Sequence, residues 1–519
     1  MTDKRPDDET LWYPPLGLMK LARYHKTLGH HVEFVVGRDP KILKEAYIDK
    51  PLFTRLWDRV YITTLFTFHF NNVVKTINYY KNAVGGTTSK IFVGGIMATL
   101  MRDEIFRETG ILPVPGILDS ARQIGLPDNT SIDLLPPDYS ILETYPYGIG
   151  NTFYAYTTRG CKHKCAYCGV HKLEPRFIPY IDIRNTIRTL RDERGDLPVL
   201  KLMDNNLLGS SELERIVDDL VELGYGRNEY TNTFPRRQRV IDFNQGLDAT
   251  HFTEKKMALL AKLNIEPMRI AFDHVREQKE YARAIRLANK HGVQKFSNYM
   301  LYNFRDTPED LYQRLKVNIE LNEEMAKEGV QKRSGKIYSY PMRFAPIADP
   351  ERRGVHKGRD IIAGDTDARR DWLREPIWTK RFLRNVEIMK GAANGAISPT
   401  PSLAWRTIGH TFEEFLSNLY MPEELIRNRN LHERKVHKEE PKRKPGSGKV
   451  EGFRAFILKL LKENGDRFMT FHKAVSSNSI DDVRATLQNI QDGEIKKWLE
   501  MYLARPKSTP SPDSSLGAK

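Results

Sequence analysis

The segment TTRGCKHKCAYCGV, residues 157–170, contains every cysteine of the 519-residue chain. Cys161, Cys165 and Cys168 follow a C-x₃-C-x₂-C spacing. Random placement would bring three cysteines this close together on the order of one time in a thousand, so inert buried thiols explain the cluster poorly. Thiolates at such short spacing are typical ligands of a soft metal or an iron–sulfur cluster.

Two kinds of metal site are consistent with these cysteines. A structural zinc site needs four ligands, and His163 or His171 could supply the fourth. However, His163 stands inside the spacer between two cysteines, and the paired C-x₂-C arms usual for zinc are missing. A [4Fe–4S] cluster can instead be held by three cysteines, which leaves its fourth iron open to a substrate or cofactor. The flanking cations Arg159, Lys162 and Lys164 would offset the charge of such a cluster.

The cysteines directly follow a predicted strand, and similar strands recur through the middle of the chain. Between residues 151 and 349, segments rich in β-branched and aromatic residues alternate with helical patterns, which is typical of a partial or full (β/α) barrel. Polar residues end each strand, and the chemistry of such barrels takes place at the carboxyl ends. The predicted strands are 152–158, 198–204, 239–245, 267–273, 295–303 and 336–344.

The remaining segments complete an α/β prediction. Helical patterns at 14–29 and 71–86 alternate with strand patterns at 31–37, 59–70 and 90–95, which favours an N-terminal doubly wound parallel sheet. Residues 131–150 have no period and predict a linker. The predicted division is an α/β domain at 1–145, the barrel at 146–350, a helical extension at 351–430, a basic linker at 431–450, a small helical region at 451–504 and a disordered tail at 505–519.

Composition limits the class of protein. Hydrophobic residues make up 40% of the chain, enough to build cores, so the chain is not predicted to be disordered. The first residues lack the apolar stretch of a secretory signal, no run is long enough to span a membrane, and an odd number of cysteines suits a reducing compartment. We therefore expect a cytoplasmic protein without a membrane partner. The net charge of +15 favours polyanionic partners.

The C-x₃-C-x₂-C motif after the first barrel strand resembles the radical S-adenosylmethionine superfamily. This resemblance implies that Cys161, Cys165 and Cys168 hold a [4Fe–4S] cluster whose open iron binds the amino and carboxylate groups of S-adenosylmethionine. Electron transfer into the sulfonium then gives a 5′-deoxyadenosyl radical, which abstracts hydrogen from a substrate. The resemblance leaves the catalytic residues and the substrate unassigned.

The same resemblance implies contacts to S-adenosylmethionine from strand-end residues. The aromatic residue before the third cysteine lies near adenine in this superfamily, the end of the second strand contacts the methionine amino group, and NQGLDA (244–249) lies where ribose or carboxylate is contacted. The segment 298–310 resembles the segment around the fifth barrel strand of this superfamily. The residues so implied are Tyr167, Asp204, Asn205, Gln245, Asp248 and Asn298.

The N-terminal segments 14–35, 91–100 and 134–142 resemble the subgroup in which a cobalamin-binding-type domain precedes the barrel, so the resemblance covers about residues 1–350. The D-x-H-x-x-G motif that supplies a histidine to cobalt is absent from the sequence. Either cobalamin binds without a protein histidine or the domain has lost it. Gly94 and Gly95 could let a bulky ligand approach closely, or could form a plain turn.

Three functions remain open at this point. The first is a radical S-adenosylmethionine enzyme that acts on a small molecule, possible reactions being methyl transfer with cobalamin or an oxidation, and that needs an electron donor such as a flavodoxin or ferredoxin. The second is a radical enzyme that modifies RNA, which the net charge and the basic segment 426–450 favour. The third, from another class, is a zinc-bound, non-catalytic binding protein.

Overall fold

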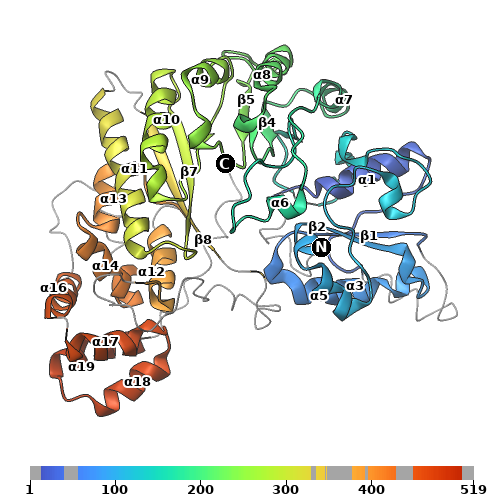
Figure 1. Cartoon of the computed structure of the whole chain (residues 1–519). Coiled ribbons are helices and arrows are strands. Elements are labelled where there is room, and N and C mark those ends of the chain that lie inside the picture. Colours follow the sequence, from blue (N-terminus) through green and yellow to red (C-terminus); the bar gives the residue numbers. More distant parts are fainter. Residues whose placement is uncertain are drawn as a thin grey trace. The chain divides into compact units, whose positions relative to one another are not determined.

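The chain forms two compact units in the computed structural model (Figure 1). The first comprises residues 1–245, 258–265 and 346–358, and the second comprises 246–257, 266–345 and 359–519. Each unit includes more than one of the segments predicted above, so the predicted domain boundaries stay predictions. The structure describes residues 13–39, 57–145, 147–328, 335–344, 347, 377–391, 395–427, 448–463 and 465–504.

The N-terminal part of the first unit is a parallel α/β structure, as predicted. Strands β1 and β2 pair in parallel from Val60 opposite Ile91 to Thr64 opposite Gly95. Buried apolar residues of the strands and of helices α3 and α5, among them Ile62, Ile77 and Val93, form one core. The elements are α1 (Leu16–Thr27), β1 (Val60–Thr64), α3 (Phe70–Tyr80), β2 (Ile91–Gly95), α4 (Ile96–Leu100) and α5 (Arg102–Thr109).

The predicted strand at 31–37 is wrong, because these residues have no ladder partner among the described strands. The backbone groups of residues 36 and 37 form hydrogen bonds with tyrosine hydroxyls instead. The Val36 N–H donates to the Tyr145 hydroxyl at 3.2 Å, and the Gly37 carbonyl accepts from the Tyr80 hydroxyl at 3.1 Å. Since these tyrosines lie far away in the sequence, an apolar run alone could not reveal that they replace a neighbouring strand.

Residues 131–150, predicted to be a linker, contain within their described part only the short 3₁₀ helices η6 (Ile132–Leu134) and η7 (Tyr139–Leu142), and their role as a linker between domains stays a prediction. After them, the first unit continues with the parallel sheet β3–β4–β5. Phe153, Leu200 and Ile241 form one fully buried row on this sheet. The elements are β3 (Thr152–Ala155), α6 (Val170–Leu173), α7 (Arg184–Arg194), β4 (Val199–Leu202), α8 (Leu213–Glu222) and β5 (Val240–Phe243).

The second unit contains a second parallel sheet, β6–β7–β8, packed with α10 and α11. All six strands predicted for the middle of the chain are therefore present, and the α/β class is confirmed. They form two three-stranded sheets within the described residues, so a closed barrel stays a prediction. The elements are α9 (Glu254–Leu260), β6 (Met268–Arg269), α10 (Gln278–Lys290), β7 (Lys295–Tyr302), α11 (Pro308–Glu328) and β8 (Lys336–Arg343).

Arg314 of α11 fixes the ends of two strands in the second unit. Its guanidinium is fully buried and donates to the carbonyls of Phe272, Asp273 and Leu301 at 3.2, 3.0 and 2.7 Å. It also pairs with the carboxylate of Asp306 at 2.9 Å. A single buried cation thus satisfies carbonyls just after β6 and at the end of β7 that the strand ladders leave unpaired.

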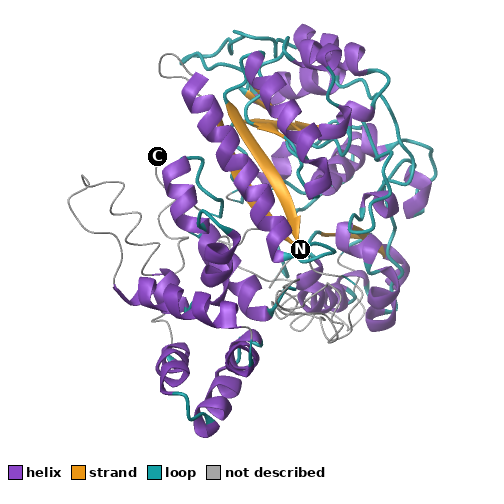
Figure 2. Ribbon diagram, turned by 60° about the vertical axis from the view of Figure 1, so that its left-hand side comes forward, coloured by secondary structure: helices purple, strands orange, loops and turns teal. Residues whose placement is uncertain are grey.

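The elements of the C-terminal part of the second unit are helices, and Figure 2 draws all helices of the chain in purple. The predicted tail and nearly all of the predicted basic linker lie outside the described residues. No described helix is long and apolar enough to cross a membrane. The helices are α12 (Lys380–Lys390), α13 (Pro401–Ile408), α14 (Phe412–Tyr420), α16 (Gly448–Glu463), α17 (Asp466–Ser476), α18 (Ile480–Asn489) and α19 (Gly493–Glu500).

Candidate functional site

The three cysteines lie in the loop that leads from β3 to α6, at the carboxyl end of β3. Cys161, Cys165 and Cys168 are all partly exposed. The loop that follows β4 in the same sheet also reaches them, because the Asn206 side-chain amide donates to Cys161 Sγ at 3.3 Å. The cysteines therefore lie at the edge of the sheet that the sequence predicted.

Hydrogen-bond donors surround two of the three sulfurs. Besides Asn206, the His163 N–H donates to Cys161 Sγ at 3.4 Å, and the Val170 N–H donates to Cys168 Sγ at 3.5 Å. The chain also turns back on itself here, since the Cys168 N–H donates to the Cys165 carbonyl at 3.0 Å. Donors of this kind stabilise thiolates relative to thiols and tune the potential of a cluster that the thiolates hold.

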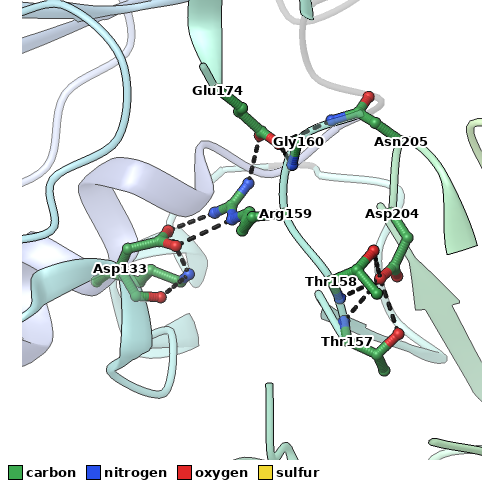
Figure 3. A network of polar contacts seen from close by, with 9 residues as sticks. Asp133, Thr157, Thr158, Arg159, Gly160, Glu174, Asp204 and Asn205 are labelled. Atoms are coloured by element: carbon green, nitrogen blue, oxygen red, sulfur yellow. Dashed lines mark hydrogen bonds and ion pairs between the residues drawn. The ribbon is translucent and has the colours of Figure 1, made fainter. Parts of the chain in front are cut away.

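Arg159, two residues before the first cysteine, is buried between two carboxylates (Figure 3). Its Nε donates to Asp133 at 2.9 Å, its Nη2 donates to the other oxygen of the same carboxylate, and its Nη1 donates to Glu174 at 2.8 Å. The guanidinium also stacks on Tyr156, with its central carbon 3.3 Å from the ring centroid. This geometry uses the planar fork that distinguishes arginine from lysine.

Lys20 of α1 completes the buried charge cluster, because its Nζ lies 3.0 Å from Asp133 Oδ1. The cluster then contains two cations and two carboxylates, so it is neutral. Burial lowers the pKa of Lys20, an effect that the Asp133 carboxylate opposes. Burial would also lower the pKa of Arg159, but Tyr156, Asp133 and Glu174 raise it above its usual range. The cluster joins α1, the linker and the cysteine loop within the first unit.

Glu174 holds the start of the cysteine loop from the side opposite Asp133. Its Oε2 accepts from the Gly160 N–H at 2.6 Å and from the Asn205 side-chain amide at 2.9 Å. Gly160 has a φ of +75°, and a Cβ at this position would lie 2.4 Å from the Arg176 carbonyl oxygen. Only glycine fits this turn, because any Cβ would clash with the Arg176 backbone, which cannot move aside as a side chain could, and because the left-handed conformation disfavours other residues.

Asp204 ties the end of β4 to the end of β3. Its Oδ1 accepts from the backbone N–H and the hydroxyl of Thr157, at 2.9 and 2.8 Å. The same oxygen accepts from the backbone N–H of Thr158 and, at 2.7 Å, from its hydroxyl. In contrast, Oδ2 is buried and has no hydrogen-bond partner in the described chain. Burial raises the pKa of Asp204, and Oδ2 is left as a buried acceptor beside the cysteine loop.

The other predicted cofactor contacts are distributed over both units. Tyr167 is partly exposed between the second and third cysteines, and Gln245 is exposed just after β5. Asp248 belongs to the second unit, where its carboxylate accepts from the Thr250 N–H at 2.9 Å and contacts His251 Nδ1 at 2.9 Å. These placements leave their contacts to S-adenosylmethionine as predictions.

Asn298 lies on the face of β7 that packs against α10. It is fully buried, and its side-chain amide donates to the Tyr281 hydroxyl at 2.9 Å. That hydroxyl donates in turn to Asn318 Oδ1 on α11 at 2.8 Å. Asn298 is therefore part of a buried polar network between sheet and helices in the second unit, and its predicted contact to S-adenosylmethionine stays a prediction.

Several residues of the site were not selected from the sequence. Asp133 stands in the linker and Glu174 follows α6, and neither has a local pattern that reveals its partner. Asn206 could have been found, since it directly follows Asp204 and Asn205 at the predicted strand end. Asp242 on β5 lies 3.7 Å from the Lys201 amine on β4, so a partly buried ion pair interrupts the apolar sheet there.

No protein-family model and no curated protein matches the chain. Among solved structures it is similar to TsrM from Kitasatospora setae, a radical S-adenosylmethionine methyltransferase, at 14% identity and a TM-score of 0.44 in two structures. With tryptophan substrate and the analogue aza-SAM bound, the match covers 60% of this chain and 69% of TsrM. With cobalamin and a [4Fe–4S] cluster bound, it covers 64% and 70%.

A further similar structure is that of SuiB from Streptococcus suis bound to S-adenosylmethionine, at 12% identity and a TM-score of 0.25, covering 38% of this chain and 40% of SuiB. Because identities and TM-scores are low, the chemistry of this chain is inferred from its own residues.

Replacing Arg159 with alanine is expected to lower the free energy of unfolding by about 3–5 kcal/mol, because Glu174 then loses its cation and Asp133 keeps only Lys20. Urea unfolding followed by tryptophan fluorescence measures this loss. Arg176→Ala is the matched control: its side chain is 77% exposed and pairs with Asp119, so its loss should cost less than about 1 kcal/mol. Equal effects of the two substitutions would contradict a structural role for the buried cluster.

Replacing Asp204 with alanine should destabilise the first unit by about 3 kcal/mol, because four buried donors lose their acceptor. Asp204→Asn keeps an acceptor oxygen and should destabilise less. The pKa of Asp204 is raised in the folded chain, so between its unfolded pKa of about 3.9 and its raised value the folded state binds more protons. Wild-type stability should therefore fall relative to Asp204→Asn as pH rises through this window. A stability difference independent of pH would contradict the raised pKa.

Proposed function

We propose that the chain is a radical S-adenosylmethionine enzyme that acts on a small molecule. The observation that supports this most is the cysteine loop itself, with three partly exposed thiols, N–H donors on two of their sulfurs and a buried carboxylate oxygen beside it. Three thiolates on one loop suit a [4Fe–4S] cluster, since that donor set leaves one iron open. When bound, the cluster would supply an electron to S-adenosylmethionine, whose cleavage gives a 5′-deoxyadenosyl radical.

The residues of the chain would then have separate tasks. Cys161, Cys165 and Cys168 would hold the cluster, and the Asn206 amide would modulate it through its bond to Cys161 Sγ. Asp204 Oδ2, which lacks a partner among the described residues, would accept from the ammonium group of S-adenosylmethionine. Arg159 and its carboxylates would keep the loop in place, which matters because a cofactor site must be preorganised by its surroundings.

A polar substrate would suit the sheet face opposite the buried apolar row. Tyr154, Lys201 and Asp242 stand next to one another on β3, β4 and β5. The Lys201 amine lies 5.8 Å from the Tyr154 ring centroid and 3.7 Å from the Asp242 carboxylate. These groups would hold a small substrate that carries polar groups.

A flavodoxin or ferredoxin would donate the electron that the cluster passes to S-adenosylmethionine.

Cobalamin is a separate part of the proposal, supported by the order of segments along the chain. At the carboxyl edge of β1 and β2, Gly95 has a φ of +99°, and a Cβ there would lie 2.3 Å from the Thr64 carbonyl oxygen, so strand packing already requires this glycine. A Cβ on Gly94 would meet only the Val114 oxygen at 3.8 Å. His25 is engaged by His30 at 3.0 Å and by the Tyr61 hydroxyl at 2.9 Å. No step of the mechanism is therefore assigned to cobalamin.

A zinc site is the second candidate, because one observation favours it. His171, one of the two candidate fourth ligands considered above, has a buried Nδ1 with no hydrogen-bond partner within the described chain. A zinc-bound, non-catalytic protein would explain that atom without radical chemistry. Metal analysis separates the two candidates.

Substituting all three cysteines with alanine is expected to abolish bound iron and sulfide and the formation of 5′-deoxyadenosine after anaerobic reconstitution. The measurements are iron and sulfide content, the broad visible absorbance of the cluster, and chromatography of the nucleoside product under a strong reductant. His171→Ala should leave all of them unchanged. One zinc per chain without iron or sulfide, lost in His171→Ala, would instead establish the zinc candidate.

Reconstitution with hydroxocobalamin should leave visible corrinoid absorbance on the protein after desalting, if the N-terminal segment binds cobalamin. The triple cysteine variant is the control, because its corrinoid binding should persist without a cluster. A desalted protein without this absorbance would remove cobalamin from the proposal while leaving the radical chemistry untouched.

A further inference from the structure

The connection between α8 and β5, residues 226–238, is an ordered hairpin at the amino end of β5. Tyr230 and Gln238 form an antiparallel bridge. Inside it, the Thr231 N–H donates to the Arg237 carbonyl at 2.8 Å, and the Arg237 N–H donates to the Thr231 hydroxyl at 3.0 Å. The backbone of this connection therefore has a defined conformation rather than that of a loose loop.

A buried ion pair anchors the base of the hairpin. Arg239 is 6% exposed, and its guanidinium donates to Asp196 at 2.6 Å and to the Gly224 carbonyl at 3.3 Å. The same Asp196 oxygen accepts from the Asn232 N–H at 2.8 Å, and the Arg239 N–H donates to the Glu229 carbonyl at 2.8 Å. One carboxylate therefore joins Asn232 on the first arm of the hairpin to Arg239 after the second arm, which fixes the base of the hairpin.

The tip presents an exposed aromatic ring that two arginines follow in the sequence. Phe234 is 98% exposed, more than any other large apolar side chain that the structure describes. Arg236 and Arg237 follow it closely, and the Arg236 guanidinium lies 5.5 Å from the Tyr230 ring centroid. The hairpin has three arginines and one glutamate, so its charge is 3 − 1 = +2. Binding residues lie disproportionately on loops that a folded scaffold positions, so the exposed ring together with the neighbouring arginines is a candidate contact for a partner.

We propose that this hairpin binds single-stranded nucleic acid. An exposed aromatic ring offers a face on which any base can stack, and neighbouring arginines neutralise phosphates. A protein partner would favour a continuous apolar patch, whereas Phe234 is followed by the cations Arg236 and Arg237. The charge of the whole chain, +15, favours a polyanion in the same way.

The hairpin and the cysteines lie at opposite edges of one sheet. The hairpin precedes β5, whereas the cysteines follow β3, and β3, β4 and β5 are parallel. Nucleic-acid binding is thus separable from cleavage of S-adenosylmethionine and does not depend on the proposed radical function. A bound strand would be anchored away from the cysteine loop.

Fluorescence anisotropy with a labelled oligouridine of about 20 nucleotides tests this proposal on the full-length chain. Phe234→Ala should weaken binding on the order of tenfold, since it removes one stacking ring. The double variant Arg236→Ala/Arg237→Ala should lower the slope of log affinity against log salt by about 1.4, which is about 0.7 for each lost phosphate contact, between roughly 50 and 200 mM. Thermal stability and cluster-dependent formation of 5′-deoxyadenosine should not change in either variant.

Matched controls are Phe106→Ala, which removes a phenylalanine that is 48% exposed on α5, and the double variant Arg107→Ala/Arg122→Ala, which removes the same charge elsewhere. Both should bind the oligonucleotide like the unmodified chain. The proposal is overturned if the unmodified chain does not bind at low salt, or if hairpin and control variants weaken binding equally. If hairpin variants lose only reduction by a flavodoxin or ferredoxin, the arm docks an acidic protein and the proposal is wrong.

Discussion

The cysteine loop depends on one buried contact, the guanidinium of Arg159 held between Asp133 and Glu174. Removing charges from water is costly, and it is offset only when every charge has a partner in good geometry. Here Lys20 supplies the second cation. The four charges are therefore all paired only when α1, the linker and the cysteine loop pack against one another. The loop that presents the cysteines is consequently formed only when α1 and the linker are in place.

A second anchor acts independently of the first. One oxygen of Asp204 accepts all four donors of Thr157 and Thr158, and so fixes the backbone just before Arg159. Together, the Asp204 anchor and the Arg159 cluster hold the approach to the first cysteine from β4, from the linker and from the segment after α6. Such double support is what a metal or cofactor site requires, because ligands placed about 1 Å too loosely lose much of their function.

Much of the fold could be predicted from the sequence. All six strands of the middle region were found, because buried parallel strands read as short apolar runs bounded by polar residues. The same rule failed at residues 31–37, whose backbone bonds to the hydroxyls of Tyr80 and Tyr145. Gly95 shows a similar limit of sequence-based prediction. The sequence allowed either a ligand contact or a turn at this position, and the close approach of the Thr64 backbone shows that strand packing requires a glycine there.

The sequence by itself determined that the three cysteines lie on one short loop, because the spacing of Cys161, Cys165 and Cys168 is local and needs no knowledge of distant contacts. It also determined the edge of the sheet at which they lie, since they follow a strand. The tertiary structure alone decided what surrounds them. Lys20 and Asp133 are separated by 113 residues, and Thr157 and Asp204 by 47. Pairs so far apart leave no periodic pattern, because their partners are chosen by folding and by the requirement that buried charges and donors be satisfied.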